Sequence, residues 1–148
     1  MKRMAFTMIE VVFVIVILGI LAVVAIPKLA ATRDDALNSS LAQNIVSGAG
    51  EIAAYATAHG EVLDDLTLMS SGMKTLVGTG YGVPGTKKMT VARGSDAACV
   101  VVEIATNSTT DTLSIITSSS SDSQCVSLQS LVDTSTYPMV LRGTNVVF

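Results

Sequence analysis

A long apolar run near the N-terminus limits more than any other feature what this chain can fold into. Residues 11–26 are sixteen consecutive apolar residues, and Glu10 stands directly before them. Residues 6–26 would be about 31 Å long as a helix, which matches the hydrocarbon core of a bilayer. The sequence therefore predicts a transmembrane helix that begins beside a carboxylate, although a charge in such a position is costly in lipid.

Glu10 separates the interpretations of this segment. A secretory signal peptide would explain the basic Lys2 and Arg3 and could be cleaved after Ala25, but its apolar region should not begin with an acid. A plain single-pass anchor explains the length and, through Lys2 and Arg3, a cytoplasmic N-terminus. Like the signal peptide, however, it does not explain why an acid stands at position 10.

A third interpretation explains more residues. The stretch "AFTMIE" followed by a long apolar helix resembles the N-terminal signature of the type IV pilin family, which includes the pseudopilins of type II secretion. The resemblance implies a leader of residues 1–5 that a prepilin peptidase removes between Ala5 and Phe6. The mature chain would begin at an N-methylated Phe6, and Glu10 would be its fifth residue. The family nearly always has glycine before the cut, where this chain has Ala5, the next-smallest residue.

Two further residues fit the same signature. Gly19 and Pro27 fall where the family has a helix-loosening glycine and a proline. Proline inside a helix removes one hydrogen bond and causes a kink, so Pro27 predicts a bend between two halves of one helix; a plain helix end at Pro27 is the alternative. The implied domains are the leader 1–5, a transmembrane helix 6–27 and a periplasmic pilin-like domain 28–148.

The resemblance also suggests why an acid stands at position 10. Filaments of this family pack such helices side by side, and a carboxylate buried among apolar helices needs a counter-charge. We hypothesise that Glu10 pairs with the free amino terminus of Phe6 on a neighbouring subunit and so sets the axial register. A glutamate that is simply solvated at the level of the lipid headgroups is the alternative.

The chain after Pro27 continues with helical periodicity. Gly60 follows as a helix stop, so the helix is predicted to run from near residue 6 to near residue 58. Its apolar residues recur at intervals of three and four, which indicates one helical face that packs on a sheet rather than on a coiled-coil partner. They are Leu37, Leu41, Ile45, Ala49, Ile52 and Ala56.

The C-terminal part is typical of β-structure. Four stretches rich in β-branched residues are bounded by turn formers, namely 88–92, 98–104, 113–118 and 137–142. Residues 61–87 are interpreted as a connecting segment and the serine-rich 118–124 as a surface loop. The predicted fold is therefore α+β, with a long N-terminal helix on a small antiparallel sheet of three or four strands, the architecture that the resemblance also implies.

The chain contains two cysteines, Cys99 and Cys125, both far from the apolar run. In an exported protein an even number of cysteines predicts a disulfide, whereas two free thiols would fit a reducing compartment. In the chain-entropy treatment, closing this loop stabilises the fold by about 3.5 kcal/mol.

Several classes of function find little support. The net charge of −3 and the scattered basic residues give no nucleic-acid footprint. The single histidine, His59, has no catalytic partner at any recognised spacing. Asp111 and Asp122 do not form the acid run of a calcium site, although major pseudopilins often bind calcium. The glycines of "GTGYGVPG" match a nucleotide motif only formally, because no strand precedes them and no helix follows.

The sequence thus predicts a non-enzymatic structural subunit without a metal or other cofactor. The preferred function is that of a pseudopilin of a type II secretion system. Before it is assembled into a filament, the protein would be anchored in the inner membrane by a single helix. Its partners would be further copies, related pilin-like subunits, a prepilin peptidase and an inner-membrane assembly platform. The alternatives are a subunit of an adhesion, motility or DNA-uptake pilus, and a membrane-anchored periplasmic binding module.

Overall fold

The computed structural model describes residues 7–107 and 110–143, and the chain divides into two compact units. The N-terminal unit is Met1–Ala36 and the C-terminal unit is Leu37–Phe148. Helix α1, Met8–His59, contributes residues to both. Its C-terminal end lies one residue beyond the predicted limit, directly before Gly60.

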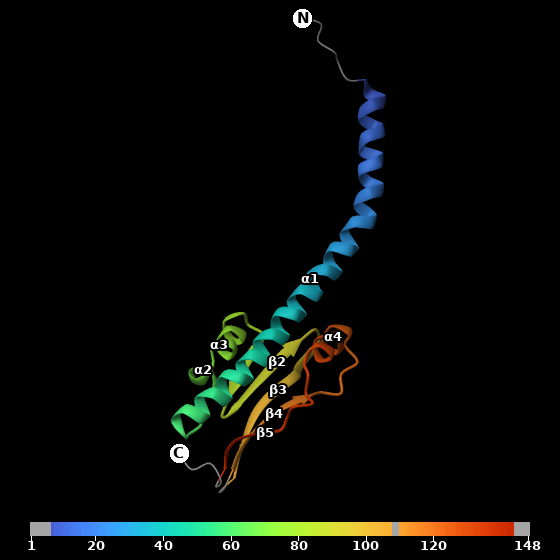
Figure 1. Ribbon diagram of the computed structural model, residues 1–148. Coiled ribbons are helices and arrows are strands. Elements are labelled where there is room, and N and C mark those ends of the chain that lie inside the picture. Colours follow the sequence, from blue (N-terminus) through green and yellow to red (C-terminus); the bar gives the residue numbers. More distant parts are fainter. Residues whose placement is uncertain (1–6, 108–109, 144–148) are drawn as a thin grey trace, which may run out of the picture. The chain divides into compact units, whose positions relative to one another are not determined.

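An antiparallel sheet of five strands forms the C-terminal unit together with helices (Figure 1). Each strand pairs with its neighbours in sequence, so the order in the sheet is the order along the chain. β2 and β3 pair antiparallel, and so do β3 and β4. The strands are β1 (Gly82–Gly85), β2 (Lys88–Arg93), β3 (Asp96–Thr106), β4 (Thr110–Thr117) and β5 (Met139–Gly143).

The α+β fold is confirmed, with one strand more than the three or four expected. The extra strand is β1, which lies in the segment interpreted as a connection. Its sequence, GVPG, is that of a turn, but Pro84 is tolerated here because β1 is an edge strand and pairs with β2 alone. β5 begins two residues after the predicted start at 137, just past Pro138, which has no N–H to donate.

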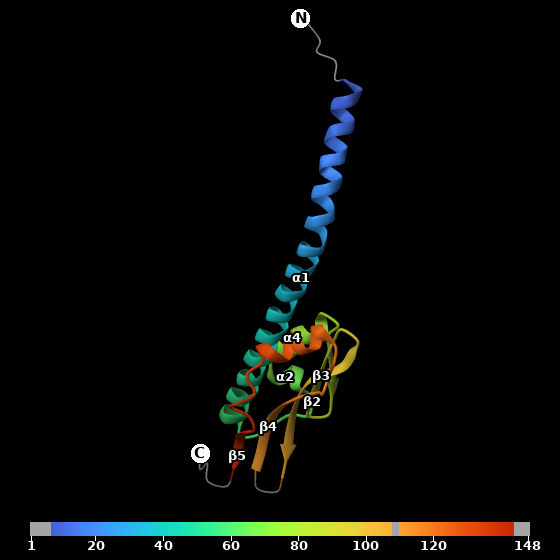
Figure 2. The same ribbon diagram turned by 90° about the vertical axis from the view of Figure 1, so that its right-hand side faces the viewer.

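The core lies between α1 and one face of the sheet (Figure 2). The predicted apolar face of α1 is confirmed, since Leu41, Ile45 and Ile52 are buried and Leu37 is partly buried. Burial of each such side chain stabilises the fold by about 1.5–3 kcal/mol. The sheet contributes alternate residues, as a half-buried sheet should. They are Met89, Val91, Val100, Val102, Leu113 and Ile115.

Three short helices were not predicted. α2 (Leu66–Met69) and α3 (Ser71–Gly78) occupy much of the segment interpreted as a connection, and α4 (Ser123–Leu131) begins within the predicted loop 118–124. Each is preceded by a side chain that caps its N-terminus: Asp65, Ser70 and Asp122. α3 lies against β1, and α4 lies against β2 and β3.

Candidate functional site

Between Val11 and Ile26, every residue of helix α1 is apolar and exposed. From Met8 to Leu29 the large hydrophobic side chains of α1 are between 41% and 87% exposed. The N-terminal part of α1 is long and apolar enough to cross a membrane as a single span. So large an apolar surface marks a membrane or protein interaction site. The N-terminal half of α1 is therefore the first candidate functional site.

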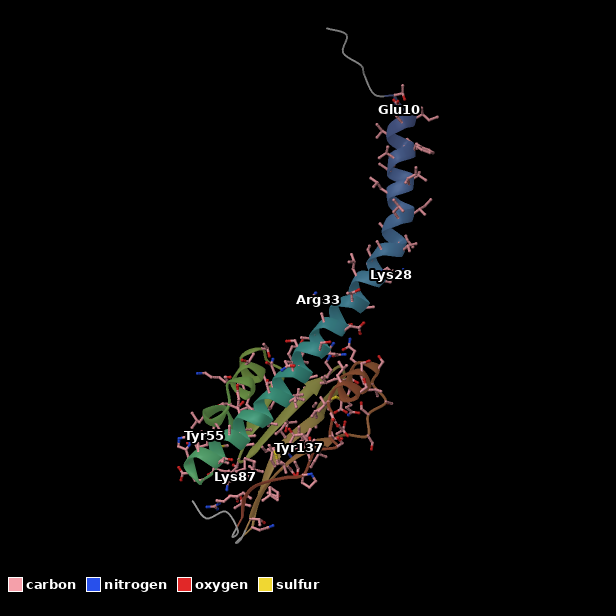
Figure 3. All side chains as sticks on the ribbon, viewed as in Figure 1. Glu10, Lys28, Arg33, Tyr55, Lys87 and Tyr137 are labelled. Atoms are coloured by element: carbon pink, nitrogen blue, oxygen red, sulfur yellow. A yellow bond between two sulfur atoms is a disulfide. The ribbon has the colours of Figure 1, made fainter. Side chains whose placement is uncertain are left out.

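Glu10 lies at the first turn of α1 (Figure 3). Its Oε2 accepts hydrogen bonds from the Thr7 backbone N–H at 2.8 Å and from the Thr7 hydroxyl at 2.6 Å. The Glu10 N–H in turn points at the Thr7 hydroxyl oxygen at 3.4 Å. This reciprocal pattern is a capping box, in which a threonine at the cap and a glutamate three residues later satisfy free N–H groups. The spacing T-x-x-E of residues 7–10 is the local signal for this cap, and it was not among the features predicted from the sequence.

Pro27 lies inside α1, so the alternative of a helix that ends at Pro27 is wrong. A proline ring leaves the carbonyl four residues earlier without its helical partner, which is the usual origin of a kink. A Cβ added at Gly19 would contact no other part of the protein: apart from its chain neighbours and the backbone of its own helix, no atom lies within 4 Å. The bend at these two residues stays a prediction. The predicted cleavage residues Ala5 and Phe6 lie outside the described residues.

The structure brings one predicted pair together. Cys99 of β3 and Cys125 of α4 form a disulfide with an S–S distance of 2.01 Å, and both residues are fully buried. The prediction of a disulfide is confirmed. The bond attaches α4 to β3, the central strand of the sheet. The Gln129 side chain reinforces the attachment, because its Nε2 donates to the carbonyls of Cys99 at 2.9 Å and Ser118 at 3.0 Å.

Asp122 anchors the N-terminal end of α4, three residues before Cys125. It caps the helix by accepting from the N–H groups of Gln124 and Cys125, and it accepts from the Ser95 N–H at 3.0 Å and hydroxyl at 2.9 Å. These bonds, led by the Ser95 N–H, lower the pKa of Asp122 to about 2. Gly94 must be glycine here, because its φ is +62° and a Cβ would lie 2.1 Å from the Asp122 Oδ1.

Glu51 holds α3 on α1. Its carboxylate accepts from the hydroxyls of Ser70 and Ser71, each at 2.7 Å, and from the Gly72 N–H at 3.1 Å. The anion thus lies at the N-terminus of α3, where free N–H groups and the helix dipole favour it. The Ser71 and Ser70 hydroxyls, followed by the Gly72 N–H, lower the pKa of Glu51 to about 2. Sequence analysis missed this contact, because it joins segments about twenty residues apart.

The Glu51 contact predicts acid sensitivity. A carboxyl whose pKa is lowered by folding stabilises the fold fully above its unfolded pKa of about 4.3, and the contribution disappears as the pH falls to 2. We expect the melting temperature to fall between pH 5 and pH 2, and less steeply in Glu51→Gln. Thermal unfolding across this range measures it. Glu61→Gln, a change at an exposed glutamate, is the matched control, and an equal slope in both variants would contradict the assignment.

The remaining polar candidates do not assemble into a site. Asp111 is buried with its Oδ2 2.9 Å from the Arg142 Nε, at the end of β3 and β4 where Thr106 pairs with Asp111. Asp122 contacts Ser95 at the opposite end of β3, so the two acids are separated by about 30 Å of strand. Within residues 7–107 and 110–143, no three His, Cys, Asp or Glu side chains are grouped to hold a metal ion.

The histidine and the glycine motif have ordinary structural places. His59 stacks on Tyr55 with ring centroids 4.0 Å apart, in the last turn of α1. Gly82 and Gly85 are the two ends of β1, whose backbone pairs with β2 and is followed by a strand, not by a helix.

Comparison of the chain with protein-family models, curated proteins and solved structures gives no match.

Proposed function

We propose that this chain is a non-enzymatic, filament-forming structural subunit, a pseudopilin of a type II secretion system. It would be inserted in the inner membrane by the N-terminal part of α1, with the C-terminal unit in the periplasm. A prepilin peptidase would remove residues 1–5, and an inner-membrane assembly platform would pass the mature chain into a filament of like subunits.

The exposed apolar surface of the N-terminal unit carries the proposal. Residues 8–26 form a helix with no covering side chains among the described residues, and the same helix continues into the core of the C-terminal unit. In a filament, packing against sister helices replaces contact with lipid. The exchange is close to balanced, because apolar helices and lipid tails are alike as solvents. A helix of this kind suits a subunit that moves between the two environments.

Glu10 distinguishes this function from simple anchoring. In one isolated subunit the carboxylate accepts from two donors of Thr7, and no cation contacts it within residues 7–107 and 110–143. In a filament core the amino terminus of Phe6 on a neighbouring copy would supply that cation. A pilin of an adhesion, motility or DNA-uptake pilus would use the same residues, so this alternative rests on the same observations. A membrane-anchored binding module would use the acid only as the helix cap that it forms with Thr7.

Proteolytic maturation is the first test of the proposal. We expect the chain extracted from membranes to begin at an N-methylated Phe6 when a prepilin peptidase is co-expressed, and at Met1 when it is not. Intact-mass measurement together with N-terminal sequencing detects both the cleavage and the methylation. Ala5→Gly should be cut at least as fast as the natural chain, because glycine is the smaller residue, and a bulky Ala5→Leu should block the cut.

The other outcomes identify the alternatives. A chain that keeps residues 1–5 in the presence of the peptidase would be a simple anchor. A chain that begins near Ile26 would be a secreted domain with a cleaved signal peptide. Either result would contradict the proposed function.

A further inference from the structure

A groove of about 340 Å³ opens on the surface of the C-terminal unit. One wall is a flank of α1 next to its buried face, and the other is the end of α4 with the segment that follows it. The residues that line the groove are Ser39, Ala42, Gln43, Val46, Leu131 and Asp133.

The lining combines apolar surface with one carboxylate. Val46 and Leu131 are 40% and 50% exposed, and both line the same groove, so they form one apolar patch rather than scattered single residues. Asp133 is exposed at the rim, and none of the six lining residues is basic. The groove therefore suits a partner that presents an apolar side chain beside a cation.

Helix α1 of this chain itself presents an apolar side chain beside a cation. Leu29 lies beyond the apolar run of residues 11–26 and is 70% exposed, and Arg33 is also exposed. Residues four apart in a helix project from the same face, so Leu29 and Arg33 form one ridge. Lys28 lies about 140° around the helix axis from Arg33 and belongs to another face (Figure 3).

This ridge has to come from a second copy of the chain. Leu29 and Arg33 precede Ser39 and Val46 in the same continuous helix, and a helix does not fold back on itself. The result is a contact between two different surfaces of identical subunits. Such a head-to-tail contact can repeat from copy to copy, and it generates a helical array where the rotation between copies does not close into a ring.

We infer that the groove binds the ridge of a second copy, with Leu29 against Val46 and Leu131 and with the Arg33 guanidinium on the Asp133 carboxylate. The planar guanidinium offers two parallel N–H donors to a carboxylate, which adds orientation to the apolar contact. This inference rests on the proposed function and names the surfaces through which the C-terminal unit of one subunit meets the helix of the next.

Charge reversal tests the ion pair in the full chain, expressed with the peptidase and the assembly machinery. Arg33→Glu and Asp133→Arg should each lower the yield of sheared filaments by about tenfold or more, and the double variant should recover most of that loss. Lys28→Glu makes the same charge change on another face and should stay within about twofold of the natural chain. Arg33 lies outside the C-terminal unit, so its effect does not depend on folding of that unit.

Cysteine crosslinking tests the apolar contact in the same filaments. Leu29→Cys combined with Val46→Cys should give disulfide-linked multimers on mild oxidation, and Lys28→Cys combined with Val46→Cys should give few. Cys99 and Cys125 are buried in their own disulfide and do not compete.

The outcomes separate this inference from the proposed function. Normal filament yield in both charge reversals, or equal crosslinking from positions 28 and 29, would overturn the groove contact while the filament itself stands. A natural chain that is processed but never forms filaments would overturn both.

Discussion

Replacing Glu10 by alanine is expected to abolish incorporation into filaments while membrane insertion continues. The change removes the carboxylate that we assign to the amino terminus of Phe6 on a neighbour, and it leaves that amine without a partner among apolar helices. Loss of one partner of a buried ion pair costs about 3–5 kcal/mol, which is large for a contact that every subunit repeats. Filament yield after shearing and the fraction retained in carbonate-washed membranes measure the two properties.

Glutamine at position 10 separates the two roles that the structure gives to Glu10. The amide oxygen of Glu10→Gln can still accept from Thr7, and glutamine is found at this place in capping boxes, so the helix start is kept. The charge is lost. We therefore expect Glu10→Gln to fail in assembly like Glu10→Ala, whereas Thr7→Ser, which keeps both the cap and the charge, should assemble.

A different pattern would assign Glu10 to the helix cap alone. If Glu10→Gln forms filaments normally while Glu10→Ala and Thr7→Ala do not, the hypothesis of an intersubunit ion pair is wrong. The capping box would then be the reason for an acid at this position.

The second large effect is expected at Gly72, where α3 crosses α1. A Cβ on Gly72 would lie 2.6 Å from the Asn44 carbonyl oxygen and 3.0 Å from the Gly48 Cα. Both are backbone atoms of α1, so the clash can be relieved only by moving one helix away from the other. We expect Gly72→Ala to lower the free energy of unfolding by about 1–3 kcal/mol, the usual cost of overpacking, with loss of the Glu51 contacts.

Gly50→Ala is the matched control for this substitution. Gly50 is exposed in α1, and no neighbouring atom lies within 4 Å of its would-be Cβ. Alanine is favoured over glycine in a helix by up to about 1 kcal/mol, so this variant should be equal to or more stable than the natural chain. Urea unfolding of the detergent-solubilised chain measures both. A Gly72→Ala variant as stable as Gly50→Ala would contradict the close helix crossing.

The long helix and the central strands could be predicted from the sequence. The stripe from Leu37 to Ala56 recurs for five turns, which is long enough for the helical period to stand out from the composition, and Gly60 gives its end. The central strands β2, β3 and β4 are rich in β-branched residues, and turn formers separate them. Two cysteines leave one possible intramolecular pairing.

The elements that were missed are short or depend on tertiary contacts. α2 has four residues and α4 has nine, so neither shows a full apolar stripe, and only their capping residues Asp65 and Asp122 gave a local signal. β1 consists of glycines, a valine and a proline, and it becomes a strand because β2 offers it an edge. The Glu51 contact needs α3 to lie on α1, which no local pattern encodes.

The sheet, whose strands follow one another in the order of the chain, has a consequence for biogenesis. During synthesis from the N-terminus, each of β2 to β5 emerges when the strand it pairs with has already been made. Such nearest-neighbour pairing has a low loop-closure cost and favours rapid folding. The apolar stripe of α1, made first, stays uncovered until β2 and β3 emerge. A nascent chain paused before residue 88 therefore carries two unprotected apolar surfaces, and that interval is when a chaperone would protect it most.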